Sequence, residues 1–215
     1  MLHWNTVDQS LKACLVDLMQ APELKKFRLV GGTALSLYLG HRLSIDIDLF
    51  TDAPYRSVDF DEIEKFLLQK YKYVTGDFGG NPGMGKSYLA GTDRDNAIKL
   101  DLYYAMDPFF QDYVTHDDIR MATVEEIIAM KVDVILRGGR KKDYWDLHQL
   151  LENYTIDQMI ELHQKRFEWT HDREKILINF KNFSDADLDF DPICLKSKEW
   201  IFIKEDFELA LKDVL

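Results

Sequence analysis

The strongest constraint on the fold of this chain is an alternating segment, residues 44–50, that follows a glycine pair at Gly31-Gly32. Side chains two residues apart on a strand point to the same side of the sheet. Asp46 and Asp48 are therefore predicted to share one face with Ser44, while apolar side chains occupy the opposite face. Those apolar side chains are Ile45, Ile47 and Leu49. The pattern predicts a strand that is buried on one face only.

The glycine pair lies between a short apolar run, residues 27–30, and a helical pattern at residues 33–39 that ends at Gly40. Glycines let the backbone approach a phosphate closely, and the N-terminus of a helix favours an anion. Gly31, Gly32 and Thr33 are thus candidates for holding a phosphate group. The alternative is an ordinary turn from a strand to a helix.

Two neighbouring carboxylates repel each other, and a divalent cation is one way to keep both ionised. Asp101 lies inside a second alternating segment, residues 97–104, where a mid-strand acid needs a partner. We therefore expect Asp46, Asp48 and Asp101 to form a metal site. The alternatives are solvated acids on an exposed strand face and, for Asp101, an outward-facing acid at a sheet edge.

The rest of the pattern divides the chain into two parts. Helical periods occupy residues 7–20 and 58–71, and strands are expected at residues 86–90 and 97–104. Beyond Pro108 helical patterns predominate, at residues 124–136, 144–151, 156–166, 173–180 and 203–214. We predict an α/β core over residues 1–115 and a helical domain over residues 116–215, which together make an α+β protein.

Charge and length narrow the function classes. The chain has 215 residues and a formal net charge of −11, which argues against broad electrostatic binding to nucleic acid. A basic stretch, residues 131–142, is the exception. We see no secretory signal and no transmembrane segment, so we expect a cytoplasmic protein without a membrane partner. Cys14 and Cys194 are expected to be reduced.

Residues 80–87 formally match a P-loop, GxxxxGK[ST]. A P-loop joins a buried strand to a helix, whereas the residues after Ser87 reach Gly91 too soon for a helix. We interpret the match as coincidental and the segment as a hairpin loop beside the active site. Hydrolysis of a nucleoside triphosphate (NTP) at this loop is the corresponding third hypothesis for function.

The segments Leu29–Leu35 and Leu39–Phe50 resemble the AbiEii/AbiGii toxin family of nucleotidyltransferases, within the DNA polymerase β-like superfamily. The superfamily pattern places Gly-Gly 9 to 13 residues before Asp-hydrophobic-Asp, and here Thr33–Ile45 supplies the spacing. A second segment, Glu125–Leu151, is similar to the family's Lys…Arg…Lys-Asp-x-x-Asp-Leu motif. The resemblance covers about residues 26–151 and implies a polymerase β-like core with a mixed sheet, followed by a mainly helical domain.

The resemblance also implies roles for individual residues. Asp46 and Asp48 would bind Mg²⁺ or Mn²⁺, and Asp101 would activate an attacking hydroxyl. Lys131 would contact the phosphates, while Asp146 or Asp143 would orient basic groups. The residues expected to bind the nucleotide are Gly31, Gly32, Thr33, Arg42, Ser44, Lys131 and Asp143. For Arg42, a phosphate contact and a salt bridge to Asp46 or Asp48 are both open.

The implied function is metal-dependent transfer of a nucleoside monophosphate from an NTP to an acceptor hydroxyl. The acceptor would be RNA, with tRNA suggested by the resemblance, or a protein. The chain would be the toxin of a toxin–antitoxin or abortive-infection system, with a cognate antitoxin as its partner. A non-catalytic NTP-binding module that regulates another protein is the alternative.

Overall fold

The computed structural model describes residues 1–214, and its strands form one sheet. The strands are β1 (Arg28–Leu29), β2 (Asp46–Thr51), β3 (Tyr73–Gly76), β4 (Gly85–Gly91), β5 (Ala97–Tyr104), β6 (Val114–His116) and β7 (Ile119–Met121). Their order across the seven-stranded sheet is β3-β4-β5-β2-β1-β7-β6. Parallel and antiparallel neighbours both occur, so the expected mixed sheet is confirmed.

The centre of the sheet positions the acidic residues. β2 runs parallel to β5, and the register places Asp48 beside Asp101 and Asp46 beside Lys99. Side chains of paired residues lie on the same face of a sheet. The opposite face carries buried side chains of both strands, among them Ile47, Leu49, Leu100 and Leu102.

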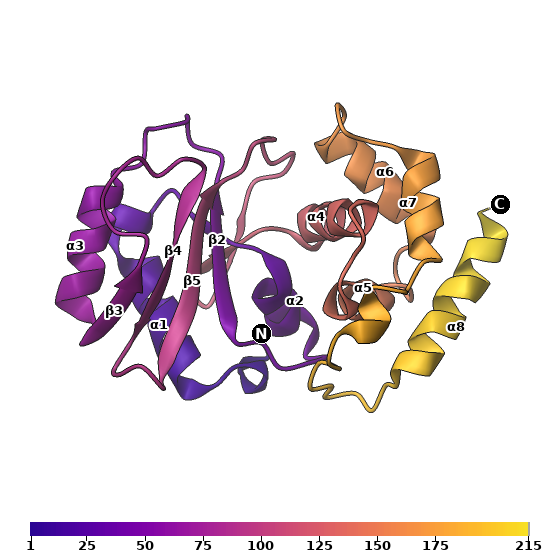
Figure 1. The fold of residues 1–215 in the computed structure, drawn as a ribbon, viewed down its shortest axis with the longest axis horizontal. Helices are drawn as coiled ribbons and strands as arrows, with labels where there is room; N and C mark the ends of the chain where they lie inside the picture. Colours follow the sequence, from indigo (N-terminus) through magenta and orange to yellow (C-terminus); the bar gives the residue numbers. More distant parts are fainter. Residues whose placement is uncertain (215) are drawn as a thin grey trace.

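Three helices belong to the part of the chain that contains the sheet: α1 (Gln9–Gln20), α2 (Gly31–Leu39) and α3 (Phe60–Lys70). α1 and α3 lie on one face of the sheet, and α2 lies between the sheet and the second half of the chain (Figure 1). Carboxylates cap α1 and α3: Asp8 accepts from the backbone N–H of Leu11, and Asp59 from that of Glu62. Both helices were expected from the apolar period.

The second half is helical, as its sequence pattern predicts (Figure 1). Its helices are α4 (Val124–Leu136), α5 (Lys141–His148), α6 (Ile156–Arg166), α7 (Arg173–Phe180) and α8 (Trp200–Ala210). The predicted bounds of α4, α6 and α7 are confirmed, and the side chains of Thr123, Thr155 and Asp172 cap these three helices. α5 and α8 each begin three residues before the predicted position.

Further details differ from the sequence-based expectation. α2 begins at Gly31, two residues before the predicted start, so the glycine pair forms its first turn. Ile45 was expected on the buried face, but β2 begins one residue later and Ile45 is 71% exposed. The hairpin of β6 and β7 was not anticipated, and it extends the sheet to Met121. The division into residues 1–115 and 116–215 stays a prediction. In the described part of the chain, Cys14 and Cys194 are free, and no helix is long and apolar enough to cross a membrane.

Candidate active site

The N-terminus of α2 opens onto the acidic strand β2. Gly31 has φ +70°, and a Cβ atom there would lie 2.6 Å from Oδ2 of Asp48. No side chain caps this end of the helix, so its first backbone N–H groups are available to an anion. Glycine is therefore required where the backbone passes the Asp48 carboxylate. The geometry brings the candidate phosphate cradle and the carboxylate together.

Thr33 and Ser44 fix the start of β2 against α2. The Thr33 hydroxyl donates to the backbone carbonyl of Asp46, and its oxygen lies 2.8 Å from Oγ of Ser44. Both side chains are buried. They act here as supports for the strand, while their expected contact with the nucleotide stays a prediction.

Asp46, Asp48 and Asp101 lie on one face of the sheet, as the alternation predicts. Burial, followed by the nearby charge of Asp101, raises the pKa of Asp48. Asp101 is held by two neighbours: the Ser87 hydroxyl donates to its Oδ1 at 2.6 Å, and the Lys99 ammonium group pairs with its Oδ2. The carboxylates of Asp48 and Asp101 therefore form a repelling pair that favours a bound cation.

The donor set fits a hard divalent cation. Within residues 1–214, no three His, Cys, Asp or Glu residues are arranged to hold a metal ion. Mg²⁺, however, usually takes one or two carboxylates together with substrate phosphates and water. Asp46 and Asp48, beside the open N-terminus of α2, supply such a partial set. A metal site at Asp46, Asp48 and Asp101 stays a prediction.

A buried ionic cluster joins the segment after α2 to α4 and α5. It is centred on Asp146, whose side chain is fully buried. Arg42 donates to it through Nε at 2.6 Å and Nη2 at 2.9 Å, and the Lys131 ammonium group lies 2.8 Å from Oδ2. His41 Nε2 lies 2.7 Å from Oδ1. Burial opposes ionisation, but the charges of Arg42 and Lys131 hold the pKa of Asp146 well below its usual value.

Asp143 completes the cluster. It pairs with Lys131 and, at 3.0 Å, with Arg140 Nε. Burial disfavours the charged form of Lys131, yet Asp143 and Asp146 raise its pKa, so Lys131 stays protonated. The expectation that Asp143 or Asp146 orients basic groups agrees with these contacts. Of the two alternatives open for Arg42, the salt bridge to Asp46 or Asp48 was wrong, because Arg42 pairs with Asp146. The phosphate contact stays a prediction.

A cleft of about 480 Å³ contains most of the candidate residues. Its charged and polar lining includes the N-terminus of α2, Asp46, Asp48 and Lys131, and its apolar lining includes Phe50 and Phe167. Asp101 and Asp146 do not line it. Asp101 lies on the neighbouring strand β5, and Asp146 lies beneath the basic groups.

Sequence reasoning assigned no role to three other residues that line this cleft: Arg140, Lys142 and Arg166. The basic stretch at residues 131–142 was the available signal for the first two. Burial, followed by the charge of Arg140, lowers the pKa of Lys142. Arg166 pairs with the buried Glu126 from α4, a contact that no local pattern reveals.

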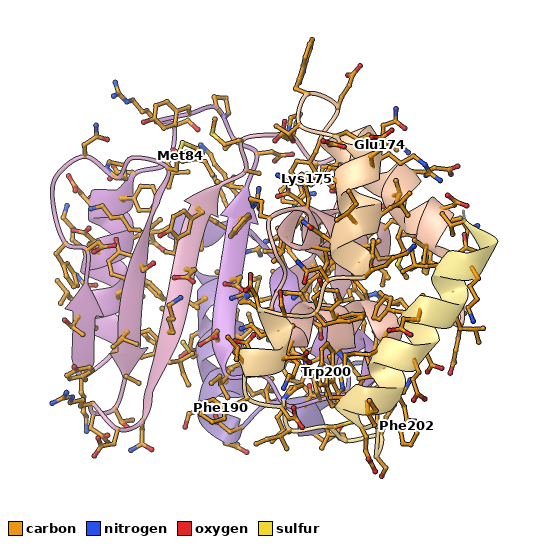
Figure 2. The ribbon with its side chains drawn as sticks, turned by 45° about the vertical axis from the view of Figure 1, so that its right-hand side comes forward. Met84, Glu174, Lys175, Phe190, Trp200 and Phe202 are labelled. Atoms are coloured by element: carbon orange, nitrogen blue, oxygen red, sulfur yellow. The ribbon has the colours of Figure 1, made fainter. Side chains whose placement is uncertain are left out.

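The P-loop match is coincidental. Lys86 is buried on β4, and its ammonium group bonds Glu64 Oε1 at 2.5 Å and the carbonyl of Gly79 at 2.9 Å. No helix follows Lys86, because β4 continues to Gly91. The loop before β4 contributes no residue to the cleft. Met84 (labelled in Figure 2), at the end of this loop, lines a neighbouring pocket that shares Tyr104, Ala105 and Met106 with the cleft. The expected position of the loop beside the active site stays a prediction.

Gly32→Ala is expected to disturb the ionic cluster around Asp146, although Gly32 itself carries no charge. A Cβ atom at Gly32 would lie 2.3 Å from Nη2 of Arg42, so the buried guanidinium must move away from Asp146. Overpacking of this kind costs about 1–3 kcal/mol. We expect a matching decrease in the free energy of unfolding in urea, and weaker NTP binding in calorimetry.

Gly80→Ala is the control for this prediction. It alters a loop glycine at which a Cβ atom meets nothing within 4 Å, although the φ of +70° carries its own strain. NTP affinity should stay unchanged in this variant. Equal NTP affinity in Gly32→Ala and the unaltered chain would contradict the prediction.

Comparison with known proteins agrees with this geometry. The profile of the family described as nucleotidyl transferase AbiEii toxin, type IV toxin–antitoxin system, matches residues 13–214. An uncharacterized protein of Aquifex aeolicus, aq_aa25, is 29% identical over 136 residues, which are 61% of this chain and 60% of that protein. The chain thus spans about 60% of the length of that curated relative.

Solved structures share the fold. A candidate nucleotidyltransferase from H. pylori superposes with a TM-score of 0.60 at 19% identity, covering 95% of this chain and 91% of that one. MenT4, a nucleotidyltransferase toxin from Mycobacterium tuberculosis H37Rv, gives a TM-score of 0.56 at 12% identity, covering 94% and 83%. At these identities the likeness shows the fold: a polymerase β-like nucleotidyltransferase fold.

Proposed function

This chain belongs to the AbiEii family of nucleotidyl transferase toxins, and from that premise we propose that it transfers a nucleoside monophosphate from an NTP to an acceptor hydroxyl. The observation that carries the proposal is the meeting of the open α2 N-terminus with Asp46 and Asp48 inside one cleft. An NTP presents a triphosphate that suits the N–H groups and basic side chains. It also presents a base and a ribose that suit the apolar side chains of the lining, such as Phe50.

The basic side chains of the cleft hold the triphosphate. Lys131 keeps its charge because two buried carboxylates flank it, and Arg140 and Lys142 line the same cleft. The N–H groups of Gly31 and Gly32 point to the same region. This clustering supports binding of the NTP with its phosphates toward α2 and its base toward Phe50, which shares the face of Asp46 and Asp48 on β2.

The reaction forms one bond and breaks another at the α-phosphorus. The acceptor oxygen bonds to that phosphorus, the bond to the bridging oxygen breaks, and pyrophosphate leaves. Asp101 accepts the hydroxyl proton, and Lys131 stabilises charge on the phosphate oxygens. Asp46 and Asp48 would hold Mg²⁺ or Mn²⁺, which would supply charge neutralisation at the reacting phosphate. Positioning and electrostatic stabilisation supply most of the rate.

We propose RNA, with tRNA as the first species to test, as the acceptor, and a cognate antitoxin as the partner. The family description, a toxin of a type IV toxin–antitoxin system, supports the partner. The basic side chains in the lining of the cleft support a polyanionic acceptor, against a net charge of −11 for the whole chain. Cytoplasmic action, where NTPs and RNA occur together, is part of the same proposal.

The test is incubation of the purified chain with each α-labelled NTP, Mg²⁺ and total cellular RNA or protein. We expect label in RNA from at least one NTP and release of pyrophosphate. Label in protein alone would contradict RNA as the acceptor but would still support the proposed nucleotidyl transfer. Binding of NTP without label in any acceptor would favour the non-catalytic module and overturn the proposed reaction.

A further inference from the structure

The ammonium group of Lys99 lies against the carboxylate that the proposed reaction uses to accept a proton. Lys99 and Asp101 are two residues apart on β5 and therefore share a face, and the ion pair joins Lys99 Nζ to Asp101 Oδ2. Across the sheet, the register pairs Lys99 with Asp46 and Asp101 with Asp48. One cation thus lies on a face that carries three carboxylates.

The ion pair can open without disturbing the core. The Lys99 side chain is 49% exposed, whereas the Asp101 side chain is 18% exposed. The Ser87 hydroxyl, 2.6 Å from Oδ1, keeps Asp101 in place when Lys99 leaves. The flexible lysine stem can carry the ammonium group into solvent, where it is well hydrated. Asp101 is therefore a fixed carboxylate with a removable cation.

We propose that Lys99 is a resident counter-ion that holds Asp101 in the metal-free protein and leaves when a divalent cation binds at Asp46 and Asp48. The proposal rests on the proposed function, because it presupposes that cation. An ammonium group and a divalent cation both seek the lone pairs of Asp101, so they compete for the same carboxylate. Lys99 thus stabilises the metal-free chain and weakens metal binding.

The test is calorimetric titration of Mn²⁺ into the full chain without nucleotide, comparing Lys99→Met with the unaltered protein. We expect Lys99→Met to bind Mn²⁺ about two- to fivefold more tightly, which corresponds to the loss of one half-exposed ion pair. Thermal melting in a chelator should show a lower midpoint for Lys99→Met, with recovery when Mn²⁺ is added.

The matched control is Lys65→Met on α3. Lys65 is also an exposed lysine, paired with Glu62 at 2.6 Å, and its replacement changes the net charge by the same amount. Its Mn²⁺ affinity should equal that of the unaltered chain. Equal or weaker Mn²⁺ binding by Lys99→Met would overturn the proposal.

A double-mutant cycle with Asp101→Asn tests whether the effect of Lys99→Met on Mn²⁺ affinity acts through Asp101. In that background Lys99→Met should change Mn²⁺ affinity little, because its partner carboxylate is gone. The same gain in both backgrounds would overturn the counter-ion role and indicate a general charge effect. Absence of Mn²⁺ binding by the unaltered chain without nucleotide would overturn the counter-ion role, which requires a cation at the carboxylates alone. The proposed reaction would stand, because substrate phosphates complete its donor set. Lys99→Gln repeats the comparison if Lys99→Met fails to fold.

Discussion

Asp48→Asn is expected to lower transfer of label from α-labelled NTP by about a thousandfold, the effect of removing one well-placed electrostatic group from an active site. Asparagine keeps the shape of the side chain and loses its charge, so the cation that the proposed reaction needs loses a ligand. Burial and the charge of Asp101 already raise the pKa of Asp48. Removing this charge relieves repulsion in the free protein, so thermal stability should stay the same or rise.

Asp48→Asn should therefore lower transfer while leaving thermal stability unchanged or higher. A loss of activity without a loss of stability separates a catalytic role of Asp48 from a structural one. Asp52→Asn is the matched control, because Asp52 follows β2 and makes only a long 3.4 Å pair with Arg28. It should leave transfer nearly unchanged. Transfer by Asp48→Asn at a tenth or more of the normal rate would sink the proposed role of Asp48.

Asp146→Asn is expected to lower the free energy of unfolding by about 3–5 kcal/mol, the usual result of removing one partner of a buried ion pair. Arg42 and Lys131 would keep their charges in a buried site, without the carboxylate that compensates them. Urea unfolding measures the difference. Asp157→Asn is the control, since its pair with Arg173 is about 40% exposed on both sides and should contribute 1 kcal/mol or less.

Acid provides a second test of the same carboxylate. The folded-state pKa of Asp146 lies below its unfolded value, because Arg42 and Lys131 stabilise the charged form. Its contribution is therefore present above the unfolded pKa of about 4 and is lost as pH falls toward the folded value. The stability gap between the unaltered chain and Asp146→Asn should shrink below about pH 4. A gap independent of pH from 7 to 3 would contradict this assignment.

Local patterns predicted the helices well and one hairpin not at all. α4, α6 and α7 combine an apolar period with a capping side chain at the start, and both signals are local. The β6–β7 hairpin has short strands, and its turn is made by Asp117 and Asp118, at φ +50° and +64°. Such turns usually carry Asn-Gly or Asp-Gly, so an Asp-Asp turn gave no recognisable signal.

The candidate site also has a part that local sequence patterns predict and a part that they do not. Strand alternation places Asp46 and Asp48 on one face, and the register of two parallel strands then brings Asp101 beside them. The pairing of Arg42 with Asp146 spans 104 residues, and no periodicity or spacing encodes it. Side-chain contacts between distant segments depend on how the helical half packs on α2. The hydrophobic pattern of each half predicts its own helices and strands, but it does not determine this packing.

The Arg42–Asp146 contact also determines how the molecule receives its ligand. One partner lies just after α2 and the other on α5, and the same carboxylate binds Lys131 of α4. One wall of the cleft is made by α2 and β2, and the other by α4 and α5. These bonds fix the separation of the two walls before any ligand binds. Opening the walls would expose unpaired buried charges, so hinge closure is disfavoured. A nucleotide that binds as proposed would therefore enter a slot of preset width, and its affinity would not be reduced by the free energy of a closing step.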